Sequence, residues 1–336
     1  MPRPLTRRRA LATALVGAAT SASLLVACTG DSGGTTATPT ASPTSTPALA
    51  AAEATTAGTA ALSEAITARA DTGATGAAAR TKAYTGPALE SANAWAKSLP
   101  ALTDTQKADN ELTSEGATLL AVSTAGTEPR QMLFQATLKK SGNPVLALLT
   151  SEATGDPFKV AALATVVPSA RLDAFSPTTL GSDPVSAATD LVATPDAVAT
   201  SFAQSVRYPD PVTSTVLATD ALSDQLRTTA AAQAKAVADQ GTFSQAHVPQ
   251  GQVGGFQLTP GNGVIVFEEL ARTDRIALRN PVKLTPGKDV TAITGIATIT
   301  TEAQLTSNEV VAFVIPASGQ ATVVAASDQL VSGTAK

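Results

Sequence analysis

Residues 131–151 read QMLFQATLKKSGNPVLALLTS, and this stretch indicates the fold of the chain. Two apolar runs flank Ser141-Gly142-Asn143-Pro144, a group of residues that favours a turn. In the first run every second position is apolar, and the positions between them hold a mixture of polar and apolar residues. The apolar positions are Met132, Phe134, Ala136 and Leu138. A period of two is typical of a strand with one face buried. The stretch therefore predicts an antiparallel hairpin that covers one side of a core.

The sequence on either side of this hairpin extends the pattern. Strand-like runs occupy residues 117–123 and 159–167, and a helix is predicted over residues 51–70. A second helix begins at Tyr84-Thr85-Gly86-Pro87, where proline suits the first helical position, and continues to Leu99. Trp95 lies among its regularly spaced apolar residues, so we expect Trp95 to anchor the core. The first half thus reads as helices followed by four strands.

The second half repeats this order after residues 176–193, which are rich in Ser, Pro, Thr, Gly and Asp. Thr194-Pro195-Asp196 predicts a helix start, and a longer helix follows with apolar residues at helical spacing between Leu222 and Val237. Strands are then predicted over residues 243–248, 252–258, 263–278, 289–300, 309–315 and 321–326. Pro260-Gly261-Asn262-Gly263 predicts a tight turn. We therefore expect an α+β protein of two tandem modules, residues 51–175 and 194–330, each with helices packed on a curved antiparallel sheet.

The N-terminus carries export signals. Residues 1–27 have a basic start, an uncharged run and small residues before Cys28, which is the order of a signal peptide. Leu25-Val26-Ala27-Cys28 resembles a bacterial lipobox, in which the cysteine receives a diacylglyceryl group. Cys28 is the chain's one cysteine, so lipidation is its expected role. The alternative to lipidation is a transmembrane helix over residues 10–27, which would be short and diluted by polar residues. The arginines at 7–9 also resemble a twin-arginine export signal, so the export route, Sec or twin-arginine, stays open.

Residues 28–50 are dominated by Ser, Thr, Pro, Ala and Gly and predict a disordered linker. The leader holds four of the 23 basic residues and none of the 27 acidic ones, so the remaining chain has a net charge of −8. This charge argues against nucleic acid as a partner, because nucleic-acid binding needs a basic surface.

Two segments resemble a known family. They are Tyr84–Glu90 (YTGPALE) and Gly261–Phe267 (GNGVIVF), and they are similar to segments of an uncharacterised family of actinobacterial cell-envelope lipoproteins with tandem NTF2-like (cystatin-like) modules. The order of leader, linker and two modules resembles the family over the whole chain, but the amino-acid sequence resembles it only in these short segments. It implies a pocket between helices and a concave sheet, suited to a small or lipidic ligand. It implies no catalytic residue, because the family has no known activity.

The sequence contains few residues typical of catalytic or metal sites. His247 is the one histidine, and no G-x-S-x-G motif accompanies it, so we expect an exposed histidine near a strand end beside Pro249. A His/Cys metal site is excluded by this count, and no calcium-loop motif is present. We expect Asp104, Asp109 and Glu111 to lie in a solvated linker. We expect Arg272, Arg275 and Arg279 to lie at a solvated edge of the sheet. The glycines at 251–263 do not form a phosphate-binding loop.

Glu268 and Glu269 are neighbours in a predicted strand, so their side chains point to opposite faces of the sheet and cannot form an acid–base pair. If one of them were buried without a partner, its pKa would rise. That residue would be the first candidate for a ligand contact.

From these observations we expect a non-catalytic, lipid-anchored binding or accessory protein on the outer face of the cytoplasmic membrane. Its expected partners are the membrane, through the diacylglyceryl group on Cys28, and a small or lipidic ligand or an envelope protein; no cofactor or metal is expected. The alternatives are a hydrolase or isomerase that works with Asp and Glu alone in an NTF2-like pocket, and a structural envelope protein without a pocket.

Overall fold

The computed structural model describes residues 45–336 except residues 169, 173, 260, 261, 280 and 281. The lipobox and most of the predicted linker therefore lie outside the described residues, as does part of the predicted turn at 260–263. Within the described chain, no helix is long and apolar enough to cross a membrane.

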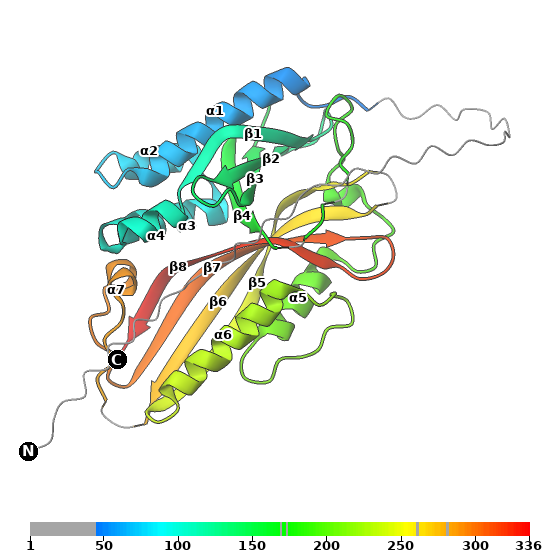
Figure 1. Ribbon diagram of the computed structural model, residues 1–336. Coiled ribbons are helices and arrows are strands. Elements are labelled where there is room, and N and C mark those ends of the chain that lie inside the picture. Colours follow the sequence, from blue (N-terminus) through cyan, green and yellow to red (C-terminus); the bar gives the residue numbers. More distant parts are fainter. Residues whose placement is uncertain (1–44, 169, 173, 260–261, 280–281) are drawn as a thin grey trace, which may run out of the picture.

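The first half contains four helices, a 3₁₀ turn and four strands (Figure 1). In order they are α1 (Ala51–Ala70), α2 (Gly76–Ala83), α3 (Gly86–Ser98), η1 (Leu99–Ala101), α4 (Asp104–Asp109), β1 (Leu112–Val122), β2 (Arg130–Leu138), β3 (Pro144–Ser151) and β4 (Lys159–Val166). The predicted hairpin is confirmed as β2 and β3, with Phe134 opposite Ala147. Helices α2 and α4 were not predicted.

The second half contains a 3₁₀ turn, three helices and four strands. They are η2 (Val185–Ala187), α5 (Pro195–Val206), α6 (Ala221–Val237), β5 (Gly241–Gln257), β6 (Val264–Leu278), α7 (Lys288–Thr294), β7 (Glu302–Ile315) and β8 (Thr322–Ala335). Helix α5 begins as predicted, because the Thr194 side chain accepts a hydrogen bond from Ala197 N and Pro195 follows it.

All eight strands belong to one antiparallel sheet of order β1-β2-β3-β4-β8-β7-β6-β5. The sequence predicted a separate sheet in each half, and that prediction is wrong in this respect. The two sets of strands join edge to edge, with Thr165 opposite Ala326 and Val166 opposite Ala325 on β4 and β8. The mixed α+β class is confirmed.

Three apolar clusters show how the sheet is buried. Helix α1 covers one face of β1–β4, and its Leu62 shares an apolar cluster with Phe134 of β2. Helix α5 covers one face of β5–β8, and its Phe202 shares a second cluster with Phe313 of β7. A third cluster joins the remaining faces of the two strand sets. It includes Leu148 of the first half and Phe267 of the second. The strongly bent sheet thus forms a core between the halves, with α1 on the outer side of one half and α5 on the outer side of the other (Figure 1).

Two predicted strand assignments in the second half are corrected. Residues 243–248 and 252–258 form most of one long strand, β5, because bulges after Pro249 and Gln252 absorb the glycine-rich interruption. Residues 289–300, predicted as a strand, contain helix α7 and a loop. Gly295 adopts a left-handed conformation (φ 75°) and ends this helix, which is a common way for a helix to stop.

Helix α3 lies between the two halves. It contacts α1, α2 and β4 on one side and β7, β8 and α7 on the other. Its alanines make this close packing possible; those that are buried are Ala88, Ala92, Ala94 and Ala96. Trp95 is only half-buried and stacks on the Arg69 guanidinium, 4.3 Å from the ring centre, so the prediction that it anchors the core is wrong.

The segment between the halves, residues 176–193, is held by backbone bonds. Thr124 N donates to Ser182 O, and Gln257 N donates to Asp183 O. The placement of the domain boundary in this segment remains a prediction.

Candidate functional site

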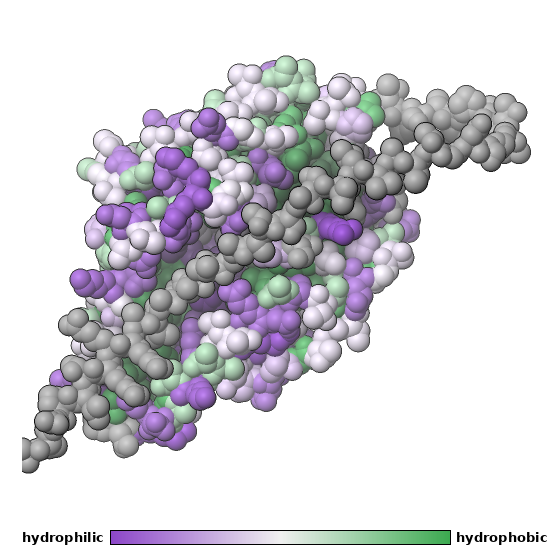
Figure 2. Space-filling view, viewed as in Figure 1, coloured by the Kyte–Doolittle hydropathy of each residue, from purple (hydrophilic) through white to green (hydrophobic). Residues whose placement is uncertain are grey.

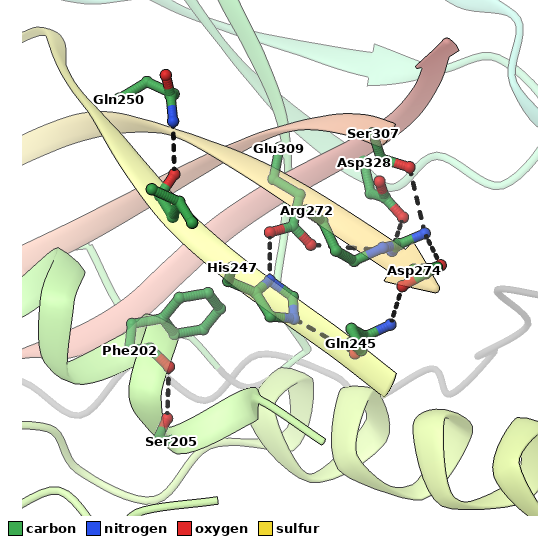
Figure 3. Close-up of polar contacts among 11 residues, drawn as sticks. Phe202, Ser205, Gln245, His247, Gln250, Arg272, Asp274, Ser307, Glu309 and Asp328 are labelled. Carbon is green, nitrogen blue, oxygen red and sulfur yellow. Dashed lines mark hydrogen bonds and ion pairs between the residues drawn. The ribbon is translucent and has the colours of Figure 1, made fainter. Parts of the chain in front are cut away.

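A network of polar side chains crosses the second half of the sheet (Figure 3). Its members come from four adjacent strands and are Gln245, His247, Arg272, Asp274, Ser307, Glu309 and Asp328. Strand register places them together: His247 is opposite Arg272, which is opposite Ser307, and Glu309 is opposite Asp328. Because paired residues share a face, these side chains all meet on the side of the sheet that α5 covers.

His247 lies inside this network. Its side chain has no exposed surface, its Nδ1 is 2.6 Å from Glu309 Oε2, and its Nε2 is 3.3 Å from Gln245 Oε1. The Phe202 ring of α5 packs against it edge-on, with 6.4 Å between ring centroids. The expectation of an exposed histidine near a strand end is therefore wrong. The sequence suggested it because Pro249 appeared to end the strand, whereas β5 continues through a bulge.

Arg272 is the cation of the network. Its guanidinium is 3.2 Å from Asp274 and 3.8 Å from Glu309, it donates to Ser307 Oγ at 3.2 Å, and it also bonds the Asp328 carboxylate. Burial acts to lower the pKa of Arg272, but the three carboxylates raise it above its ordinary value. The prediction of a solvated sheet edge is wrong for this arginine, because β6 pairs with β5 and β7 on its two sides.

The network contains more acid than base. Three carboxyl groups, those of Asp274, Glu309 and Asp328, surround the one guanidinium. Burial raises the pKa of Asp274, while Arg272 and the hydrogen bond from Gln245 act to lower it. The chemistry available here is mutual charge neutralisation, since nearly every polar atom faces another member of the group.

Glu268 lies on the same face of β6, in an apolar environment. It is fully buried, neither carboxylate oxygen has a hydrogen-bond partner, and Val311 is its neighbour on β7. Burial, and after it the charge of Asp196 on α5, raise the pKa of Glu268 to about 7. Glu269 lies on the opposite face, as the sequence predicted, and contacts Asn308. Of the two glutamates, Glu268 is thus the buried, unpartnered one.

Other residues considered in the sequence lie elsewhere. Asp104 belongs to helix α4, while Asp109 and Glu111 form exposed ion pairs with Lys140 and Lys139 at 2.6 and 2.8 Å. Arg275 pairs with Glu302 at 3.2 Å near the surface. The lipidation residue Cys28 and the lipobox residues Leu25, Val26 and Ala27 lie outside the described residues.

Shallow clefts open on the described part of the molecule, among them two in the second half. One, of about 280 Å³, lies beside the loop between α5 and α6 and includes Ser205, Asp220 and Arg227; the other, of about 460 Å³, lies beside α7 and includes Pro286 and Thr291. Neither is lined by Glu268 or by the polar network. Among the described residues, no group of three or more His, Cys, Asp or Glu side chains is placed to hold a metal ion.

On the face shown in Figure 2, hydrophilic residues are spread over both halves with hydrophobic residues in small groups between them. The chain matches no protein-family model, no curated protein and no solved structure.

Sequence reasoning overlooked most of the network. The sequence pattern that could have revealed the network is a set of polar residues placed two apart in otherwise apolar strands. These pairs are Gln245 with His247, Arg272 with Asp274, and Ser307 with Glu309. Such residues share a face, so a histidine, an arginine and acids on neighbouring strands can meet. Strand order was also needed, and the sequence did not provide it.

Proposed function

We propose that this protein is a non-catalytic, lipid-anchored accessory or binding protein on the outer face of the cytoplasmic membrane, held there by a diacylglyceryl group on Cys28. The non-catalytic part rests on one observation. Both ring nitrogens of His247 contact other side chains of the network, and its side chain is fully buried. A general base must reach the proton that it removes, so this geometry favours a role in holding four strands together.

We also propose that the two halves are tandem modules of one design. The proposal is supported by the shared order of helices followed by four antiparallel strands, and by the mirrored strand order in the sheet, in which the last strands of the two halves are neighbours. The helix-covered faces on the outside and the shared apolar cluster inside fit this arrangement. The NTF2-like identity of the modules rests on the sequence resemblance.

Cell fractionation tests the anchor. The variant Cys28→Ser is expected to be left uncleaved or released into the medium, because the thiol that receives the lipid is missing. Membrane attachment that stays unchanged, together with normal cleavage of the leader, contradicts the proposal.

Complementation of a deletion strain tests the absence of catalysis. His247→Ala is expected to restore the wild-type phenotype at a temperature where the variant is shown to be folded. A folded His247→Ala protein without function would place His247 in an active site.

A second candidate function is a hydrolase or isomerase that uses carboxylates. One observation favours it, the raised pKa of Glu268, because perturbed carboxyl groups are concentrated at active sites. Under this function Glu268→Gln would abolish the phenotype without loss of folding. Under the preferred function Glu268→Gln keeps the phenotype.

A further inference from the structure

Helix α3 makes a polar contact with the second half that differs from the rest of its alanine-rich packing. Asn308 of β7 is buried, and its Nδ2 lies 3.1 Å from Glu269 Oε1 and 3.3 Å from Glu90 Oε2. The carbonyl oxygen of Pro87 is 3.5 Å from the same nitrogen. Glu90 and Pro87 belong to α3, whereas Glu269 belongs to β6. Two carboxylates from different halves of the chain therefore meet at one amide group.

The side-chain amide of Asn308 has fewer N–H donors than there are oxygen acceptors around it. A side-chain amide has two N–H donors, and three oxygens surround it. Two carboxylates that share a site disfavour each other's ionisation, so a proton on one of them is favoured. Glu269 is half-buried and Glu90 is exposed. Burial, followed by the charge of Glu90, raises the pKa of Glu269, and the hydrogen bond from Asn308 opposes this.

No cation on the surrounding strands lies opposite the pair to compensate it. The residues directly opposite Glu269 and Asn308 on the neighbouring strands are uncharged: Gly251, Ala271, Val310 and Gln329. The charges of the Arg272 network are on the opposite face of the sheet. Helix α7, which packs on α3 and β8, carries Lys288 and Asp289, one of each sign.

This contact lies where the two halves of the molecule meet, so it can affect how they are held together. The halves share a short strand pairing, Thr165–Ala326 and Val166–Ala325, and the apolar cluster behind it. Helix α3 lies between the halves and touches strands of both, and Glu90 and Pro87 lie near its N-terminal end. A change in charge at this end acts on how firmly α3 is seated.

We propose that Glu269, with Glu90 beside it, forms a proton-dependent latch: α3 is seated most firmly when Glu269 carries a proton, and α3 loosens from β7 and β8 when that proton leaves. This inference goes beyond the proposed function and does not depend on it. It assigns to the fold a conformational response to pH.

Hydrogen exchange of the α3 backbone, measured by mass spectrometry on the full chain in detergent and EDTA between pH 5 and 8.5, tests the latch. Glu269→Gln mimics the protonated carboxyl, so its α3 should stay seated at every pH. The ratio of wild-type to Glu269→Gln exchange rates over residues 86–98 at the same pH cancels the intrinsic pH dependence. This ratio should be near one at low pH. At high pH it should rise to about tenfold for each unit by which the pKa of Glu269 is raised.

Two further variants make the test specific. Glu90→Gln removes the other carboxylate and should match Glu269→Gln, whereas Glu64→Gln, at an exposed position of α1, should match the wild type. Residues 195–206 of α5 provide an internal reference that the latch does not touch. The proposal is overturned if the ratio of wild-type to Glu269→Gln exchange rates stays constant over the whole pH range. It is also overturned if the Glu90→Gln protein shows the same rise in α3 exchange with pH as the wild type.

Discussion

His247 and Glu309 contact each other across an intervening strand. His247 lies on β5 and Glu309 on β7, with β6 between them, yet Nδ1 and Oε2 are 2.6 Å apart. Neighbouring strands are separated by about 4.8 Å, so both side chains must lean over β6 to meet. The contact ties three strands together on the face of the sheet that α5 covers (Figure 3).

His247→Ala is expected to lower the free energy of unfolding by about 3 kcal/mol, because it leaves the buried Glu309 carboxylate without its closest partner. Urea unfolding at pH 7 measures this change. Gln250→Ala, at an exposed position on the same strand, is the control and should change stability by less than about 0.5 kcal/mol. Equal effects of the two substitutions would show that the buried contact contributes nothing.

Arg272→Gln is expected to be destabilising by about 3–5 kcal/mol at pH 7, because three carboxylates lose their shared cation. Without that cation the folded-state pKa values of the carboxyl groups rise. The variant should therefore recover stability as the pH falls towards 5, where the folded protein takes up protons. Urea unfolding at both pH values measures the recovery, with the surface substitution Arg275→Gln as control. A loss that is the same at both pH values contradicts this account.

Glu268→Gln is expected to stabilise the protein at pH 8 and to have little effect at pH 5. The pKa of Glu268 is raised from 4.5 to about 7, so the folded state binds the proton more tightly than the unfolded state. The carboxyl group therefore has its most favourable effect on stability below pH 4.5, and that effect is lost as the pH rises through 7. The gain at pH 8 is at most about 3 kcal/mol.

Urea unfolding of Glu268→Gln and the wild type at both pH values measures this difference. Glu64→Gln is the exposed control. A Glu268→Gln protein that is less stable than the wild type at pH 8 would mean that the buried carboxylate has a compensating partner.

Gly58→Ala is expected to destabilise the protein although alanine is the better helix former by about 1 kcal/mol. A Cβ atom at Gly58 would lie 2.2 Å from the Phe134 ring, so α1 would have to move away from β2. Overpacking of this kind costs about 1–3 kcal/mol. Thermal unfolding of Gly58→Ala, Phe134→Leu and the double variant checks this, since the smaller side chain should make room for the methyl group. Additive losses would contradict direct contact as the cause.

The sequence predicted the four strands of the first half, but neither its short helices α2 and α4 nor the long strand β5 of the second half. Alternation between Gln131 and Ser151 is interrupted once by a strong turn, so β2 and β3 could be recognised. In β5 the glycines near Gly254 resemble a loop, although they permit close packing on Gln131 and Leu148 of the other half. That contact is long-range and has no local signal.

The candidate site shows the same limit. The opposite faces of Glu268 and Glu269 follow from strand geometry and were predicted correctly. The burial of His247 depends on Glu309, which follows it by 62 residues in the chain, and on a strand order that brings β5 near β7. Strands β5 to β8 are neighbours in the sheet in the order of the chain, so the pairing that lacks a visible marker in the sequence is the one that joins the halves, β4 with β8.

The pairing of β4 with β8 has a consequence for biosynthesis. Strand β4 is complete before any part of the second half is made, but its partner is the last of the eight strands to be synthesised. During translation the edge of β4 therefore remains uncovered while β5, β6 and β7 follow, and an open strand edge is a template for mispairing with other chains. The first half thus depends on the last strand of the chain for protection against aggregation, and folding that is completed only after synthesis would suit this topology.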